Sequence, residues 1–251
     1  MSYRIITGSR ALVLAATLIM VPALPLAAQG RGGGGRGGAQ NPKAAAPIDL
    51  TGYWVSIVDE DWRFRMVMPP AGDYMGVPMT AEAGKVAATW DPAKDEASGD
   101  VCKAFGAPSL YRQPGHLHIT WQDDQTLQVE MDAGKQTRLL HFGKSKPPAG
   151  PSTLQGDSVA DWETAGVRSL KVETSHLKAG YLRKNGVPYS ENATVLEYYD
   201  TLKERDGSIM LVVTTSVTDP QYLREPFIVT THFKKQNSDA GWSPSACTAK
   251  W

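Results

Sequence analysis

From His116 to the C-terminus the chain is a succession of short apolar or alternating segments separated by turn residues. Asp-Asp, Ala-Gly, Asp-Gly and Asp-Pro pairs punctuate these segments, and such pairs favour tight turns. Consecutive strands joined by short polar turns favour antiparallel pairing. About nine strands of this kind bury their apolar faces best as a barrel or a barrel-like sandwich. The predicted strands span residues 50–58, 63–68, 116–122, 126–132, 136–142, 168–176, 195–204, 208–218 and 226–235.

One segment that precedes this region predicts a helix. Thr80 is a suitable N-cap for the alanine-rich run that extends to Trp90, and the pair Asp91-Pro92 ends it. The sequence therefore predicts a single all-β domain with one short helix, at residues 80–90.

Alternation of apolar and polar residues fixes how the strands at 116–122 and 126–132 pair. Setting Trp121 opposite Leu127 keeps one face of both strands apolar, as a half-buried sheet requires. In the same register His116 lies opposite Asp132, and this pair is a candidate ligand-binding group.

The same register sets His118 opposite Glu130, and a turn at residues 133–135 then sets Glu130 opposite Arg138. The three side chains are predicted to form a row across three neighbouring strands. A carboxylate between an imidazole and a guanidinium stays ionised and orients the imidazole, so the row is a candidate catalytic group for acid–base chemistry. The alternative is a cross-strand ladder of ion pairs on the solvent face, which contributes little to stability.

A second group of polar and aromatic residues surrounds a turn at Asn185-Gly186. Cations and tyrosines at the mouth of a barrel are suited to an aromatic or anionic ligand, and loops on a rigid scaffold often carry function. In the alternative, these side chains only cover the end of the barrel. The candidate ligand-binding residues are Tyr181, Arg183, Lys184, Tyr189, Glu197 and Tyr198.

The histidines do not have the spacing of a metal site. In cupin metal sites a His-x-His strand is followed by a glutamate a few residues later, whereas here Gln122 and Asp123 take that place. The phosphate-binding glycine patterns, the Gly-x-Ser-x-Gly turn and the His-Glu-x-x-His motif do not occur in the sequence. The sequence therefore predicts no metal and no cofactor.

The N-terminal region predicts export. Residues 1–28 have the pattern of a secretory signal peptide, with early arginines, an apolar stretch at 11–24 and small residues at the end. That stretch is too short and too interrupted by proline to favour a membrane anchor. Residues 29–47 are rich in Gly and Ala and contain no aromatic residue, so we expect a disordered tether. The β-barrel domain is expected over residues 48–251, in the periplasm or outside the cell.

The net charge of zero conceals an uneven distribution. The whole chain has 26 Lys and Arg residues and 26 Asp and Glu residues. Because five of the basic residues lie in the predicted signal peptide and tether, residues 48–251 carry 21 basic and 26 acidic residues, a net charge of about −5. A mildly acidic domain disfavours nucleic acid as a partner. It favours a small molecule that is either neutral or bound by a few nearby cationic side chains.

The two cysteines, Cys102 and Cys247, lie far apart in the part of the chain that is expected to be exported. In an oxidising compartment two such cysteines are expected to form a disulfide. Closing so long a loop stabilises a domain by about 3–5 kcal/mol. The bond would fasten the C-terminal segment to the early part of the domain.

Two resemblances bear on the fold. The run LTGYW at 50–54 resembles the Gly-x-Trp opening of the lipocalin and avidin-like (calycin) barrels, which implies a lipocalin-like antiparallel barrel with a ligand site at one end. From Ile48 to the C-terminus the chain resembles a family of exported, β-rich bacterial proteins for which no activity is established. The blocks DAGKQTRLLHF at 132–142 and GYLRKNGVPYSE at 180–191 carry this resemblance, which implies an exported β-rich domain.

Three functions follow from these observations. The first, which the sequence favours, is an exported barrel that binds a small molecule. The second is a metal-independent lyase, isomerase or hydrolase that uses the row of His118, Glu130 and Arg138. The third is an interaction domain of the cell envelope. A binding protein or an enzyme is expected to enclose a lined cavity, and an interaction domain a filled core.

Overall fold

Strands predominate in the part of the chain that the computed structural model describes, residues 41–143, 150–166 and 168–250. The predicted signal peptide and residues 29–40 of the predicted tether lie outside the described residues. The helices are α1 (Trp62–Arg65), α2 (Ala81–Ala88), α3 (Pro92–Ser98) and the short 3₁₀ turns η1 (Lys103–Phe105) and η2 (Leu110–Arg112). The strands are β1 (Gly52–Ile57), β2 (His116–Trp121), β3 (Thr126–Met131), β4 (Ala133–Gly134), β5 (Gln136–Phe142), β6 (Asp157–Glu163), β7 (Ser169–Ser175), β8 (Gly180–Arg183), β9 (Val187–Tyr189), β10 (Thr194–Lys203), β11 (Ile209–Thr218), β12 (Phe227–Gln236) and β13 (Ser245–Ala246).

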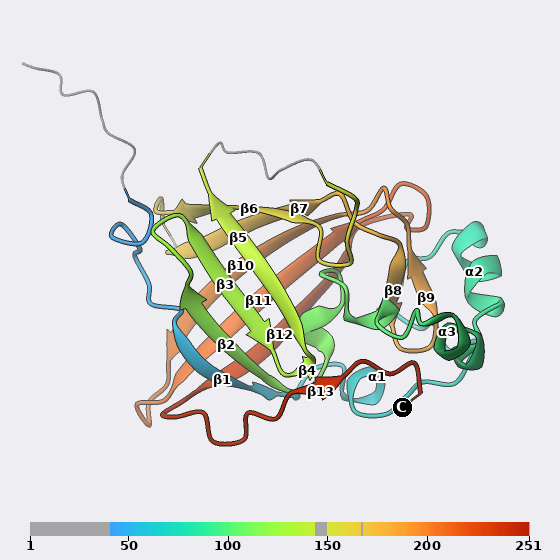
Figure 1. The fold of residues 1–251 in the computed structure, drawn as a ribbon, viewed down its shortest axis with the longest axis horizontal. Coiled ribbons are helices and arrows are strands. Elements are labelled where there is room, and N and C mark those ends of the chain that lie inside the picture. Colours follow the sequence, from blue (N-terminus) through green and yellow to red (C-terminus); the bar gives the residue numbers. More distant parts are fainter. Residues whose placement is uncertain (1–40, 144–149, 167, 251) are drawn as a thin grey trace, which may run out of the picture. The chain divides into compact units, whose positions relative to one another are not determined.

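Nine of these strands close into a barrel in the order β1-β12-β11-β10-β7-β6-β5-β3-β2 (Figure 1). The prediction of a β-barrel is therefore confirmed. Strands β5 and β6 pair in parallel, so the sheet is mixed and the prediction of a wholly antiparallel barrel is wrong. Helices α2 and α3 lie with the β8–β9 hairpin beyond one end of the barrel (Figure 1).

The helix predicted at 80–90 is present as α2, and its N-cap is the predicted one: the Ala83 amide donates to Thr80 Oγ1 at 3.1 Å. The prediction of only one helix is wrong, because α1 and α3 also form. Residues 63–68, which were predicted to be a strand, contain most of α1. Their alternation does not mark a buried apolar face, because Arg65 is buried whereas Met66 and Val67 are exposed.

The larger of two apolar clusters, around Trp54, fills the barrel, and the smaller, around Phe227, joins one end of the barrel to β8, β9 and the neighbouring loops. A polar layer lies between them, as the inward-facing residues of β10 show: Val195 belongs to the smaller cluster, Glu197 to the layer and Tyr199 to the larger cluster. Side chains therefore occupy the interior, and a ligand site has to be sought elsewhere in the fold. The buried polar residues of the layer are Arg138, Ser158, Thr174, Glu197, Thr215 and Thr231.

The predicted pairing of the first two long strands is confirmed, because Trp121 lies opposite Leu127 and His118 opposite Glu130 in β2 and β3. The predicted pairing of β3 with β5 is wrong by one residue: Glu130 lies opposite Thr137. A slip of one residue turns every side chain of a strand to the other face of the sheet. Arg138 consequently points into the barrel.

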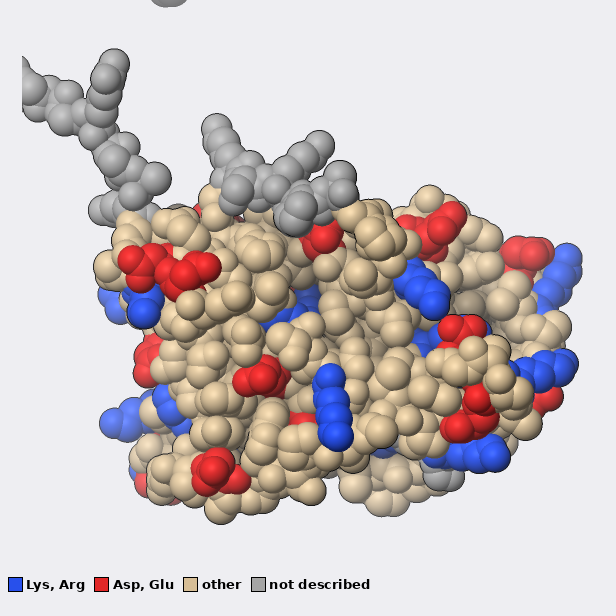
Figure 2. Space-filling model, viewed as in Figure 1, with Lys and Arg blue, Asp and Glu red and all other residues tan. Residues whose placement is uncertain are grey.

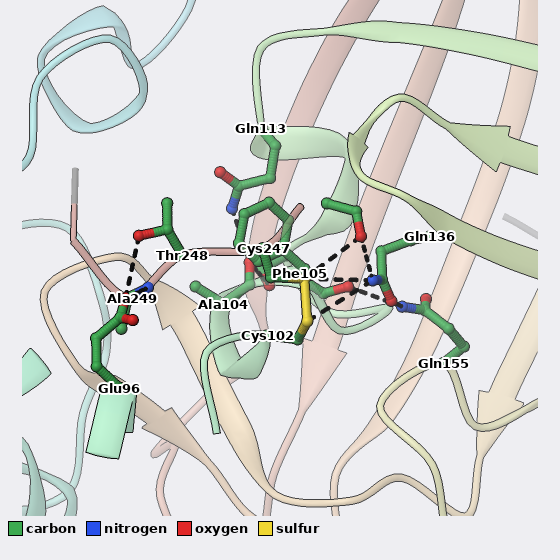
Figure 3. Close-up of a disulfide and its surroundings, with 12 residues drawn as sticks. Glu96, Cys102, Ala104, Phe105, Gln113, Gln136, Gln155, Cys247, Thr248 and Ala249 are labelled. Carbon is green, nitrogen blue, oxygen red and sulfur yellow. Dashed lines mark hydrogen bonds between the residues drawn. A yellow bond between two sulfur atoms is a disulfide. The ribbon is translucent and has the colours of Figure 1, made fainter. Parts of the chain in front are cut away.

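The predicted disulfide is confirmed: Cys102 and Cys247 are bonded, with their Cα atoms 5.1 Å apart (Figure 3). Around it, Gln136 Nε2 donates to Cys247 Sγ at 3.4 Å, and the Ala249 amide donates to Glu96 Oε1 at 2.8 Å. Strand β13 also pairs in parallel with β4. The C-terminal segment is thus fastened to the barrel by a covalent bond and by hydrogen bonds on both sides of it.

The described end of the predicted tether contacts the barrel. Trp162 Nε1 donates to the backbone oxygen of Pro42 at 2.9 Å, so the chain is anchored a few residues before the expected domain boundary at 48. Among the described residues, no helix has the length and apolar character that crossing a bilayer requires.

Candidate functional site

The predicted catalytic row does not form. His118 Nδ1 lies 3.1 Å from Glu130 Oε2 on the outer face of the barrel, and the His118 ring stacks on Tyr53 with 4.1 Å between ring centroids. Arg138 is on the inner face, where it pairs with Glu197. The barrel wall therefore separates the guanidinium from the imidazole that it was expected to assist.

The candidate pair of His116 and Asp132 is formed, with His116 Nδ1 2.8 Å from Asp132 Oδ2. The carboxylate is buried and its Oδ1 accepts from the backbone amides of His116 and Ala133, both at 2.7 Å. The Asp132 backbone oxygen accepts from the Ser245 amide at 2.9 Å. These contacts tie the β3–β4 turn to the C-terminal segment and leave the carboxylate little capacity for a ligand.

The second predicted group is divided by the structure. Tyr181, Arg183 and Lys184 stay together on β8 and the turn that follows it. Tyr189 is buried in the smaller apolar cluster. Of the remaining two, Glu197 belongs to the polar layer, and Tyr198 lies on β10 opposite Lys171 and Thr214 with its ring half-buried. The Tyr181 hydroxyl donates to Asp95 Oδ2 at 2.9 Å and is engaged by that contact.

Lys184 supplies a pH-dependent prediction, because burial lowers the pKa of its ammonium group from 10.5 to about 8. Between these two values the unfolded chain binds more protons than the folded chain, so the free energy of unfolding rises with pH. We expect a rise on the order of 1 kcal/mol between about pH 7.5 and 9.5, measured by urea unfolding. Lys184→Met should remove this rise, and Lys178→Met, at an exposed lysine, should keep it. An equal rise in the Lys184→Met variant would contradict the assignment.

The polar layer is organised around a wholly buried ion pair. Arg138 donates from Nη1 and Nη2 to the two carboxylate oxygens of Glu197 at 2.9 and 2.7 Å. Its Nη2 also donates to Thr174 Oγ1 at 3.1 Å, and the hydroxyls of Tyr111 and Tyr199 lie 2.8 Å apart beside the pair. Burial lowers the pKa of Arg138, but the charge of Glu197 outweighs this and holds that pKa well above its usual value, so the guanidinium is charged. Because neither side chain is exposed, the pair is a structural element of the barrel.

Three other buried arginines meet at the end of the barrel where β12 begins, and together they form the arginine cluster: Arg65 of α1, Arg112 of η2 and Arg183 of β8. Arg65 Nε donates to the backbone oxygen of Arg112 at 3.0 Å. Arg112 Nη1 donates to Asp61 Oδ2 at 2.9 Å, and Arg183 Nη1 donates to the backbone oxygen of Met75 at 2.7 Å. Segments that are distant in sequence thus bring three guanidinium groups together.

Glu60 and Asp61 pair directly with the guanidiniums of the arginine cluster, and the carboxylates of Asp59 and Asp73 lie near enough to favour the charged forms of Arg65 and Arg183. Burial, and then repulsion by Arg112, lower the pKa of Arg65 and of Arg183 to about 10. Two buried groups, Arg112 Nη2 and Arg183 Nε, have no hydrogen-bond acceptor among the described residues. A buried charged donor without an acceptor is destabilising. Arg138 Nε in the polar layer is a third such donor, so the feature that favours an anion here is the occurrence of two of them in one cluster at the barrel end.

One group of side chains next to the cluster has the composition of a cation site. Ligand atoms of Asp59, Glu60 and His232 lie within 4.8 Å of one another. His232 Nδ1 lies 3.0 Å from Asp59 Oδ1 and 3.1 Å from Glu60 Oε2. Glu60 also pairs with Arg65, so hydrogen bonds to His232 and the ion pair with Arg65 already account for this group.

The structure therefore defines a closed, mixed β-barrel with three buried arginines gathered at one end. No protein-family model matches the chain, and no curated protein matches it.

Sequence reasoning identified Arg183 but not Arg65 or Arg112. Arg65 stands in a run that alternates like a strand, and Arg112 stands in an unassigned segment before Pro114. The one signal that they share is an arginine next to aromatic residues, and that signal alone does not separate a buried arginine from an exposed one.

Proposed function

We propose that the protein is an exported, lipocalin-like barrel that binds a small organic anion at the arginine cluster. The observation that carries this proposal is the pair of buried donors without an acceptor, Arg112 Nη2 and Arg183 Nε. Guanidinium groups bind carboxylates and phosphates through charge-assisted hydrogen bonds that are stronger than neutral ones. The proposal keeps the small-molecule function that the sequence favours and moves the site from the barrel interior to the barrel end. The second candidate is an interaction domain of the cell envelope, which the filled barrel interior favours.

Charge and disulfide agree with such a role. Figure 2 shows acidic and basic side chains intermingled on the face of the molecule in view, with no broad basic area there of the kind that nucleic acid requires. The Cys102–Cys247 disulfide supports a location in an oxidising compartment, the periplasm or the exterior of the cell. The catalytic alternative loses its support, because Arg138 is separated from His118 and Glu130.

The test is binding of simple anions to the purified chain by isothermal titration calorimetry. We expect one anion per chain from a panel of acetate, benzoate, octanoate and inorganic phosphate. Arg112→Gln should weaken binding about 10- to 100-fold, which corresponds to the loss of a charge-assisted hydrogen bond of about 1.5–3 kcal/mol.

The matched control is Arg205→Gln, which removes one positive charge from the exposed turn between β10 and β11. It should bind the anions like the wild type. Circular dichroism checks that both variants are folded. Failure of every anion to bind the wild type, or equal affinities in the Arg112→Gln variant, would rule the proposed function out.

A further inference from the structure

We infer that the arginine cluster is built for the carboxylate group of an amphipathic ligand, and that the side chain of Asp61 holds this position until the ligand displaces it. The inference rests on the proposed function and specifies its ligand class. It depends on three features of the site: where the Asp61 carboxylate lies, which donors it leaves unused and which side chains surround them.

Asp61 directs its carboxylate to the arginines instead of to its own helix. It is the N-cap residue of α1, where an aspartate normally accepts from amides of the first turn, yet its side chain makes no such hydrogen bond. Its backbone is left-handed, with φ of 52°, a conformation that costs energy for a residue other than glycine. Its Oδ2 lies 2.9 Å from Arg112 Nη1 and 4.0 Å from Arg183 Nη2. A carboxylate therefore already occupies the space between the two guanidiniums.

The Asp61 carboxylate does not use the full binding capacity of the two arginines. It makes one hydrogen bond of normal length, to Arg112, and leaves Arg112 Nη2 and Arg183 Nε without an acceptor. A carboxylate has two oxygens with about four acceptor positions. One that is not tethered to the α1 backbone can turn and approach both arginines. A free carboxylate is therefore complementary to the site in a way that Asp61 is not.

Aromatic rings flank the guanidiniums and favour an apolar body next to the charge. The Arg183 guanidinium lies 3.9 Å from the centroid of the Phe64 ring and 5.7 Å from that of Phe227. Arg112 lies 5.8 Å from the same Phe227 centroid. These rings leave little room for the hydration shell of an inorganic anion and offer a surface to a hydrocarbon chain or an aromatic group.

The segment that carries Asp61 also exposes an unusual set of large apolar side chains. Two of them adjoin the site: the backbone oxygen of Met75 accepts from Arg183, and Trp62 follows Asp61 in the chain. An amphipathic ligand with its head group on the arginines would cover part of this apolar rim, and its burial would add to affinity. The exposed fractions are 57% for Trp62, 50% for Met66, 52% for Val67 and 65% for Met75.

Calorimetric titration with octanoate, octan-1-ol and inorganic phosphate tests the ligand class. We expect octanoate to bind one per chain, and both octan-1-ol and phosphate to bind at least 10-fold more weakly, because each lacks one half of the amphipathic ligand. Asp61→Asn keeps a side chain that tolerates the left-handed backbone and removes the competing charge, so it should bind octanoate several-fold more tightly. Asp124→Asn makes the same change of charge in the exposed turn between β2 and β3, and should leave octanoate affinity unchanged.

The outcomes separate this inference from the proposed function. If phosphate binds as tightly as octanoate and its binding depends on Arg112, the protein is an anion binder and the inference is wrong. Weaker octanoate binding by the Asp61→Asn variant would also overturn it, because Asp61 would then be part of the binding surface. If no anion binds the wild type, the proposed function and the inference fail together.

Discussion

Glu197→Gln is expected to lower the free energy of unfolding by about 3–5 kcal/mol, because it leaves the Arg138 charge buried without a partner. Both side chains are wholly buried, and two hydrogen bonds of 2.9 and 2.7 Å join them. A glutamine keeps the shape of the side chain and can accept from only one of the two guanidinium nitrogens. Urea unfolding followed by tryptophan fluorescence measures the loss.

Two further variants decide whether the ion pair is the cause. Glu204→Gln makes the same chemical change in an exposed turn, and its effect should stay within about 0.5 kcal/mol. Replacing both partners, as Arg138→Met with Glu197→Leu, removes the two charges together and should recover most of the stability lost by Glu197→Gln. If Glu197→Gln costs no more than Glu204→Gln, the polar layer does not stabilise the barrel in the way described.

The strands around Arg138 show how much of the fold can be predicted from local sequence patterns. The pairing of β2 with β3 was predictable because a slip of one residue would place the apolar residues of one strand beside the polar residues of the other, and the short turn between the strands limits larger slips. The turn into β5 was not, because its length depends on left-handed conformations at Gly134 and Lys135, with φ of 80° and 50°. A difference of one residue in this turn decides whether Arg138 faces solvent or the interior.

An inward-facing arginine would also have been rejected on local grounds, since a buried charge is costly without a partner. The partner is Glu197, 59 residues further along the chain. The sequence alone contains no indication that these two residues meet. The predicted pair of His118 and Glu130, by contrast, needed only two adjacent strands and was correct.

The remaining errors in the fold have a similar origin. The parallel pairing of β5 with β6 joins only residues 140–142 to residues 158–160, and the β6 segment at 157–163 has no strict alternation. Helix α1 has only four residues and forms in a sequence that alternates like a strand. In both cases contacts with the rest of the barrel decide the local structure.

The candidate site was partly predictable for a physical reason. Arg183 was found because it stands beside a turn in a group of cations and tyrosines, and such groups favour binding sites. The other two members of the arginine cluster come from α1 and η2, which have no strong local signal. A site that is assembled from three short, irregular segments is visible only once those segments have been brought together.

Loss of the Cys102–Cys247 disulfide is the second change for which we expect a large effect. The bond joins residues separated by 145 positions. In the chain-entropy model, cutting a loop of this length lowers the free energy of unfolding by about 3–5 kcal/mol, because the unfolded chain gains conformational freedom. The variant with both Cys102→Ser and Cys247→Ser should therefore unfold at a markedly lower urea concentration than the wild type.

The position of the disulfide predicts a local effect on the C-terminal segment in addition to the entropic effect on the unfolded chain. Hydrogen bonds that hold the C-terminal segment, from the Ala249 amide to Glu96 and from Gln136 to Cys247, lie on either side of the bond (Figure 3). Without the disulfide only these few contacts hold the end of the chain, so residues 245–250 should detach locally more often. Amide hydrogen exchange should therefore rise across residues 245–250 more than in β10 and β11. Unchanged stability together with unchanged exchange in this segment would show that the disulfide does not fasten the C-terminal segment. A loss of stability without local exchange would assign its whole effect to the unfolded chain.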